Sequence, residues 1–147
     1  MDAGLVEELS TVVARQLPCG VRAREAADLI RYATSARWVG IYSVTDTHVE
    51  NEAWSGPSAP AHPVFSVGKG LTSHAIRTGR PVVSNDVATD PRYLTNQQDS
   101  GAELIVPVLK HGRVVGTLDV EDHRTDAFTA DDVARYEQLA QTLTQLW

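Results

Sequence analysis

Two apolar runs that meet at His111 and Gly112 constrain the fold of this chain more than any other stretch of the sequence. Residues 102–110 read AELIVPVLK, and residues 113–123 read RVVGTLDVEDH. Both runs are rich in β-branched and aliphatic side chains, and Gly112 supplies the positive φ that a tight hairpin turn requires. The sequence therefore predicts a β-hairpin over residues 102–123.

Three carboxylates interrupt this hairpin at its open end. Asp119 and Glu121 share one face, because side chains alternate across a strand. A loop of only two residues would place Glu103 opposite residue 120, on the other face. An odd loop, or a bulge near Pro107, would place all three carboxylates on one face. A bulge at Pro107 is plausible in physical terms, because proline has no backbone N–H to donate to the ladder. We predict this odd register.

Composition and charge exclude several classes of function. The 147 residues are 42% hydrophobic, which suits one folded domain spanning residues 1–147. Thirteen lysines and arginines against nineteen acidic residues give a net charge of −6, which disfavours nucleic acid and anionic membrane surfaces. We find no transmembrane run and no signal-peptide pattern, and we expect a cytoplasmic protein. The single Cys19 excludes an internal disulfide and a cysteine zinc cluster.

Periodicity outlines the remaining elements and the fold class. We expect helices with apolar residues at helical spacing and strands rich in β-branched and aromatic residues. The expected helices span about 5–17, 22–34, 71–78 and 126–147, and the expected strands 38–44, 48–54, 64–67 and 81–84. Thr129 and Asp132 stand at the spacing of a capping box, and residues 55–63 form a Gly/Pro/Ser-rich loop. Short turns between strands favour an antiparallel α+β domain with the terminal helices on one face of the sheet.

Several motifs in this order resemble those of GAF domains. They are the glycine-led helix and strand in VGKGLTSHAIRTGRPVVSNDVATDP, the hairpin with its GTLDVE segment, and the Phe-Thr-x-x-Asp start of the last helix. With residues 38–42 included, the resemblance covers almost the whole chain. It implies a GAF-like antiparallel sheet with N- and C-terminal helices packed on one face and a ligand pocket under loops on the other.

Within this family the chain is most similar to the free methionine-(R)-sulfoxide reductases. Residues 37–42, RWVGIY, resemble the aromatic strand whose tryptophan lines the reductase pocket, and Glu121 stands where those enzymes carry an aspartate. The resemblance implies a site for a small-molecule ligand, formed by Trp38, Tyr42, Tyr93, Glu103, Asp119 and Glu121. Carboxylates beside an aromatic wall suit a cationic amine. Gly40, on the aromatic face of its strand, leaves room for a ligand or a close-packed helix.

The chain departs from these reductases in its cysteines. The positions that match the reductase cysteines are His62, Thr72 and Asn96, and none of these side chains can attack a sulfoxide as a thiolate. Cys19 lies far upstream without a partner cysteine. We therefore assign no catalytic residue. No cofactor is implied, and no ligand-spaced histidines indicate a metal site.

Three functions stay open at this level. We favour a non-catalytic sensory or signalling domain that binds an amine or amino-acid-like molecule and forms a homodimer through its terminal helices. A divergent sulfoxide reductase that uses Cys19 and an external thiol is the enzymatic alternative. A purely structural dimerisation domain is the third. If the carboxylates instead sit at solvated strand ends, and Trp38 and Tyr42 are ordinary core residues, the ligand-binding hypothesis fails.

Overall fold

The computed structural model describes residues 2–147, which form one antiparallel sheet with helices on both faces. The six strands lie in the order β3-β2-β1-β6-β5-β4. The strands are β1 (Trp38–Val44), β2 (His48–Ser55), β3 (Val64–Ser66), β4 (Val82–Ser84), β5 (Ala102–Lys110) and β6 (Arg113–Asp122). The helices are α1 (Ala3–Ala14), α2 (Cys19–Thr34), α3 (Gly70–Thr78) and α4 (Ala130–Thr142), with 3₁₀ turns η1 (Val87–Thr89) and η2 (Leu143–Leu146). The expected α+β fold with an antiparallel sheet is confirmed.

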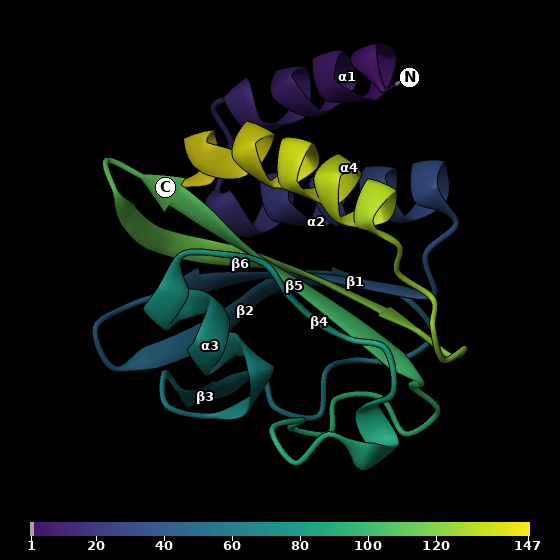
Figure 1. The fold of residues 1–147 in the computed structure, drawn as a ribbon. Coiled ribbons are helices and arrows are strands. Elements are labelled where there is room, and N and C mark those ends of the chain that lie inside the picture. Colours follow the sequence, from purple (N-terminus) through teal and green to yellow (C-terminus); the bar gives the residue numbers. More distant parts are fainter. Residues whose placement is uncertain (1) are drawn as a thin grey trace.

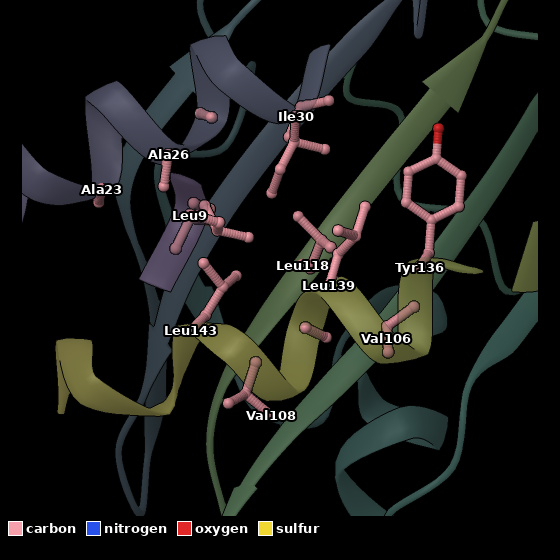
Figure 2. Packing of buried hydrophobic residues seen from close by; sticks show 14 of the residues in the cluster. Leu9, Ala23, Ala26, Ile30, Val106, Val108, Leu118, Tyr136, Leu139 and Leu143 are labelled. Atoms are coloured by element: carbon pink, nitrogen blue, oxygen red, sulfur yellow. The ribbon is translucent and has the colours of Figure 1, made fainter. Parts of the chain in front are cut away.

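The two faces of the sheet carry different layers. Helices α2 and α4 pack against one face, with α1 lying over these two helices, while α3 and the connections around β3 and η1 lie on the other face (Figure 1). The main core lies between the three helices and the sheet, where side chains such as Ile30, Leu118 and Leu139 interlock (Figure 2). This arrangement leaves the second face available for a smaller, more polar site. Among residues 2–147, no helix is long and apolar enough to cross a membrane.

The hairpin of β5 and β6 has the odd register that the sequence predicts. His111 and Gly112 form a two-residue turn with φ values of 54° and 77°. Val108 pairs with Gly116 while Leu109 pairs with Val114, so Val115 is an extra residue that bulges out of the ladder. The bulge lies close to Pro107, although the extra residue belongs to the opposite strand. Beyond it, Glu103 pairs directly with Glu121.

Local signals set the ends of the helices. Helix α3 ends at Gly79, whose φ of 65° is the left-handed conformation that stops many helices. Thr129 and Asp132 form the predicted capping box at the start of α4. The predicted helix over residues 126–147 is wrong at both ends, because α4 begins after this cap and gives way to the 3₁₀ turn η2 after Thr142.

We expect Leu118→Ala to lower the free energy of unfolding by about 2–5 kcal/mol. Leu118 is fully buried between β6 and the helical layer, and truncation there removes apolar contacts and leaves a cavity. Leu17→Ala is the matched control, because Leu17 is 42% exposed and should cost less than about 1 kcal/mol. Urea unfolding of both variants measures the difference. Equal losses would contradict this placement of the core.

Candidate functional site

The candidate site lies on the sheet face opposite α1, α2 and α4. Pairing of Gly40 with Asp119 and of Trp38 with Glu121 brings the aromatic strand β1 beside the carboxylates of β6. A Cβ at Gly40 would lie 2.4 Å from the Trp38 ring and 2.9 Å from the Tyr42 ring. Glycine is therefore needed here so that the two rings can close over the strand. The expected room for a ligand or a helix at Gly40 is filled by these rings.

Glu103, Asp119 and Glu121, which we call the carboxylate cluster, are withdrawn from solvent. Their exposed fractions are 5%, 4% and 1%. Glu103 and Glu121 are direct cross-strand partners, and Asp119 lies two residues from Glu121 on the same face of β6. The alternative in which these carboxylates sit at solvated strand ends is wrong. Burial of three adjacent carboxylates is costly unless protons, donors or a cation compensate them.

Only part of the carboxylate cluster has hydrogen-bond partners within the chain. The Tyr93 hydroxyl donates to Oε1 of Glu121 at 2.8 Å, and the Asn96 side-chain amide donates to Oε2. In contrast, Oδ1 of Asp119 is buried without a partner among residues 2–147. The hydroxyl of Thr117, two residues before it in β6, is also buried and unpaired in that range. Unpaired buried polar atoms are uncommon in folded proteins and often indicate a functional site.

A small cavity lies next to the unpaired carboxylate. The volume open to the centre of a water-sized molecule is about 20 Å³. The cavity therefore has room for about one water molecule or one ammonium group. Rings of Tyr42 and Phe65 meet edge to face beside it, with centroids 5.9 Å apart. The lining residues are Tyr42, His62, Phe65, Gly70, Leu71, Thr72, Leu94, Asn96, Glu103, Ile105 and Asp119. The cavity thus combines an aromatic wall with two acidic side chains.

The structure separates the six predicted site residues into three groups. Tyr42, Glu103 and Asp119 line the cavity. Glu121 and Tyr93 form the hydrogen-bonded layer beside it. Trp38 is fully buried and donates from its indole Nε1 to the Ser58 carbonyl oxygen at 3.0 Å. The tryptophan therefore supports a loop over the site and does not line the cavity.

Two covering loops, residues 56–63 and 90–101, are bonded to each other over the cavity. The Ser58 hydroxyl donates to Oε1 of Gln97 at 2.5 Å, and Nε2 of Gln97 donates to the Ala59 carbonyl oxygen at 3.2 Å. The Ala61 amide donates to Oδ1 of Asn96 at 3.2 Å, so Asn96 joins this loop to Glu121. Sequence reasoning missed Gln97, and its only signal was an amide side chain in a turn-rich stretch. The loop at residues 55–63 closes over the site.

Burial determines the protonation of the carboxylate cluster. It raises the pKa of Asp119 to about 8. Burial and the facing Glu121 raise the pKa of Glu103 well above its ordinary range. Burial also raises the pKa of Glu121, although the hydrogen bonds from Asn96 and Tyr93 act in the opposite direction. The cluster therefore retains protons at pH values where exposed carboxylates are fully ionised.

Comparison with known proteins identifies the family. The family model described as GAF domain matches residues 23–147. The chain belongs to the GAF domain family. A GAF domain-containing protein A from Dictyostelium discoideum is 26% identical over 107 residues, covering 72% of this chain and 66% of that protein. A free methionine-R-sulfoxide reductase from Escherichia coli K12 is 23% identical over 124 residues, which cover 84% of this chain and 74% of that protein.

A solved structure agrees with this assignment. The free methionine-R-sulfoxide reductase from Neisseria meningitidis, in complex with its substrate, is 25% identical and superimposes with a TM-score of 0.86. The match covers 97% of this GAF domain and 85% of that chain. The fold and the similarity to the reductases, both expected from the sequence, are confirmed.

The GAF domain gathers at its cavity the three positions that, from the resemblance in sequence, we expected to match reductase cysteines. His62, Thr72 and Asn96 all line the cavity, although they come from a covering loop, from α3 and from the second covering loop. Cys19 instead packs against the core on the helical face of the sheet, where burial raises the pKa of its thiol. In residues 2–147 no three His, Cys, Asp or Glu side chains are arranged to hold a metal ion.

We expect the GAF domain to lose stability as the pH rises from 5 to 8. Because burial raises the pKa of Asp119 to about 8, the folded protein keeps a proton that the unfolded chain releases. This contribution is complete below the unfolded pKa and is lost as the pH rises through the folded one. The free energy of unfolding should fall by about 1.4 kcal/mol per pH unit between pH 5 and 7 for each retained proton.

Urea unfolding across this pH range measures the slope. Asp119→Asn should reduce the slope, since the amide does not titrate. Asp46→Asn, at a turn where the side chain is 92% exposed, should leave it unchanged. A wild-type stability that is constant or rises over this range would contradict the retained proton.

Proposed function

We propose that this GAF domain is a non-catalytic ligand-binding domain whose pocket accepts the ammonium group of a small amine or amino-acid-like molecule. The observation that carries the proposal is the buried Oδ1 of Asp119, which has no partner among residues 2–147 and belongs to a side chain that lines the cavity. An ammonium group donates three hydrogen bonds and carries the charge that a buried carboxylate needs.

The electrostatics of the pocket favour a cation over an anion. No lysine or arginine in residues 2–147 forms an ion pair with a member of the carboxylate cluster, and none lines the cavity. The neighbouring rings of Tyr42 and Phe65 present π-systems that attract a cation. A negatively charged ligand would find no lysine or arginine at the cavity and would be repelled by any ionised carboxylate of the cluster.

The size of the cavity limits which part of a ligand it holds. About 20 Å³ accommodates an ammonium group but not the body of an amino acid. The rest of such a ligand would occupy space that the covering loops now close, so binding requires these loops to move apart. This opening would break the hydrogen bonds that Asn96 and Gln97 form with the loop at residues 56–63.

The relatives named above include a GAF domain-containing protein and free methionine-R-sulfoxide reductases, so reductase activity is the second candidate. Against it, His62, Thr72 and Asn96 line the cavity in place of thiols. Cys19 lies on the opposite face of the sheet, and its raised pKa disfavours the reactive thiolate. Our proposal also includes a sensory role and homodimerisation through the terminal helices α1 and α4.

We expect isothermal titration to detect binding of free methionine, methionine sulfoxide or methylamine. N-acetylmethionine is the matched ligand control, because it keeps the side chain and lacks the charged amine. Asp119→Asn should weaken binding by at least about tenfold, since it removes the charge that pairs with the ammonium. Asp46→Asn should leave the affinity unchanged. Equal binding of methionine and its N-acetyl derivative would refute an ammonium site.

We expect no reduction of free methionine sulfoxide with dithiothreitol as electron donor. The physical reason is the lack of a thiol at the cavity, since sulfoxide reduction begins with attack by a thiolate. Chromatography measures the reaction in wild type and in Cys19→Ala as the decrease in methionine sulfoxide with time. Turnover that disappears in Cys19→Ala would establish the enzymatic alternative.

A further inference from the structure

We propose that the carboxylate cluster holds a proton in the free protein and releases it when an ammonium group binds, so that the pocket exchanges one H⁺ for one R–NH₃⁺. This inference rests on the proposed function for its ligand and concerns how the same site is regulated. It would make ligand binding sensitive to pH near neutrality.

The geometry of the sheet forces the three carboxylates together. Glu103 and Glu121 face each other across adjacent strands, where like charges destabilise the pair. Asp119 follows on the same face, beside Gly40 of β1, which contributes no side chain. With at most 5% exposure, water cannot screen these charges. Full ionisation would place three negative charges in one desolvated site, which is far less favourable than retaining a proton.

The surroundings of the carboxylate cluster offer little positive charge. From β1 the neutral phenol of Tyr42 lines the cavity, and from α3 the neutral Thr72. From the covering loops come Tyr93, Asn96 and His62. His62 is therefore the one basic side chain that lines the cavity among residues 2–147.

The charged residues farther out are acidic or already paired. The negative charge of Asp90 contributes to the raised pKa of Glu103, and Asp90 itself forms an ion pair with Arg92 at 2.7 Å. The negative charge of Asp99 contributes to the raised pKa of Glu121, and Asp99 itself forms an ion pair with Arg37 at 2.7 Å. Each arginine is thus engaged by an outer carboxylate. A proton remains the compensating charge available to the inner cluster.

An ammonium group can take over the role of this proton. Entering beside Asp119, it donates to the unpaired Oδ1 and brings one positive charge. The carboxyl proton passes to solvent, so that the net charge of the occupied site equals that of the free site. No covalent bond other than the O–H bond breaks, and the balance is R–NH₃⁺ plus the protonated cluster giving the bound ammonium plus H⁺.

The exchange predicts the direction of the pH effect. Release of one proton makes the dissociation constant fall by about tenfold for each unit of rising pH, as long as the free cluster is protonated. The dependence should level off near pH 8, where Asp119 loses its proton in the free protein. Methylamine, whose amine resembles that of a lysine side chain, stays charged throughout this range.

Calorimetric titration at pH 7 in two buffers tests the exchange. Phosphate and MOPS differ in their heats of ionisation, and neither contains a primary amine that would compete. Methylamine and methionine sulfoxide are the probes. The difference in observed binding heat between the buffers gives the number of protons released, and we expect about one per bound amine.

Variants identify the source of the proton. His62→Gln should still release about one proton, whatever its affinity, while a count that falls to zero would make the imidazole the source and overturn the proposal. Asp46→Asn should behave as wild type. Binding with no proton released would overturn the exchange and leave the proposed function standing. No heat with either probe would remove both.

Carboxyl ¹³C resonances of the ligand-free wild type provide a second measurement that does not depend on any variant or ligand. At least one of Glu103, Asp119 and Glu121 should remain protonated at pH 7. Titration of all three below pH 5 would contradict the retained proton and with it the exchange.

Discussion

The burial of three carboxylates on one face of the sheet is the constraint on which the site depends. It originates in one extra residue, because Val115 bulges from β6 and moves every residue beyond it into the odd register. Without that bulge, Glu103 would face the apolar layer of α1, α2 and α4. With it, the helical face stays uniformly hydrophobic, and the acidic side chains gather on the other face. A backbone irregularity therefore separates the core from the site.

The second face is closed by contacts that differ in kind from those of the core. Trp38 and Tyr42 close over Gly40, and the covering loops are held by amide hydrogen bonds of Asn96 and Gln97. Such bonds contribute about 1 kcal/mol each, far less than the packing beneath the helices. The helical layer can thus stay fixed while the loops move. Under the proposed function, this division would let a ligand enter without disturbing the core.

Family membership and pocket chemistry give different information about function. The chain is a GAF domain and superimposes on a free methionine-R-sulfoxide reductase with a TM-score of 0.86. A shared fold supports many activities, and the activity is decided by the groups at the site. Here the cavity combines Glu103 and Asp119 with His62, Thr72 and Asn96. The two carboxylates have the chemistry to recognise a cation, whereas the histidine, threonine and asparagine cannot supply a thiolate.

The sequence alone determined the order of elements, the hairpin, the capping box at Thr129 and the apolar face of each helix, because these follow from local periodicity and turn chemistry. Alternation along one strand also placed Asp119 and Glu121 on one face, whereas Glu103 joins them only through the odd register that the bulge at Val115 creates. Only the tertiary structure decided that Trp38 supports a loop, that Gln97 joins two loops, and that Asp119 keeps an unpaired oxygen. The contacts of Trp38 and Gln97 join residues 20 to 39 positions apart in the chain, for which no local pattern exists.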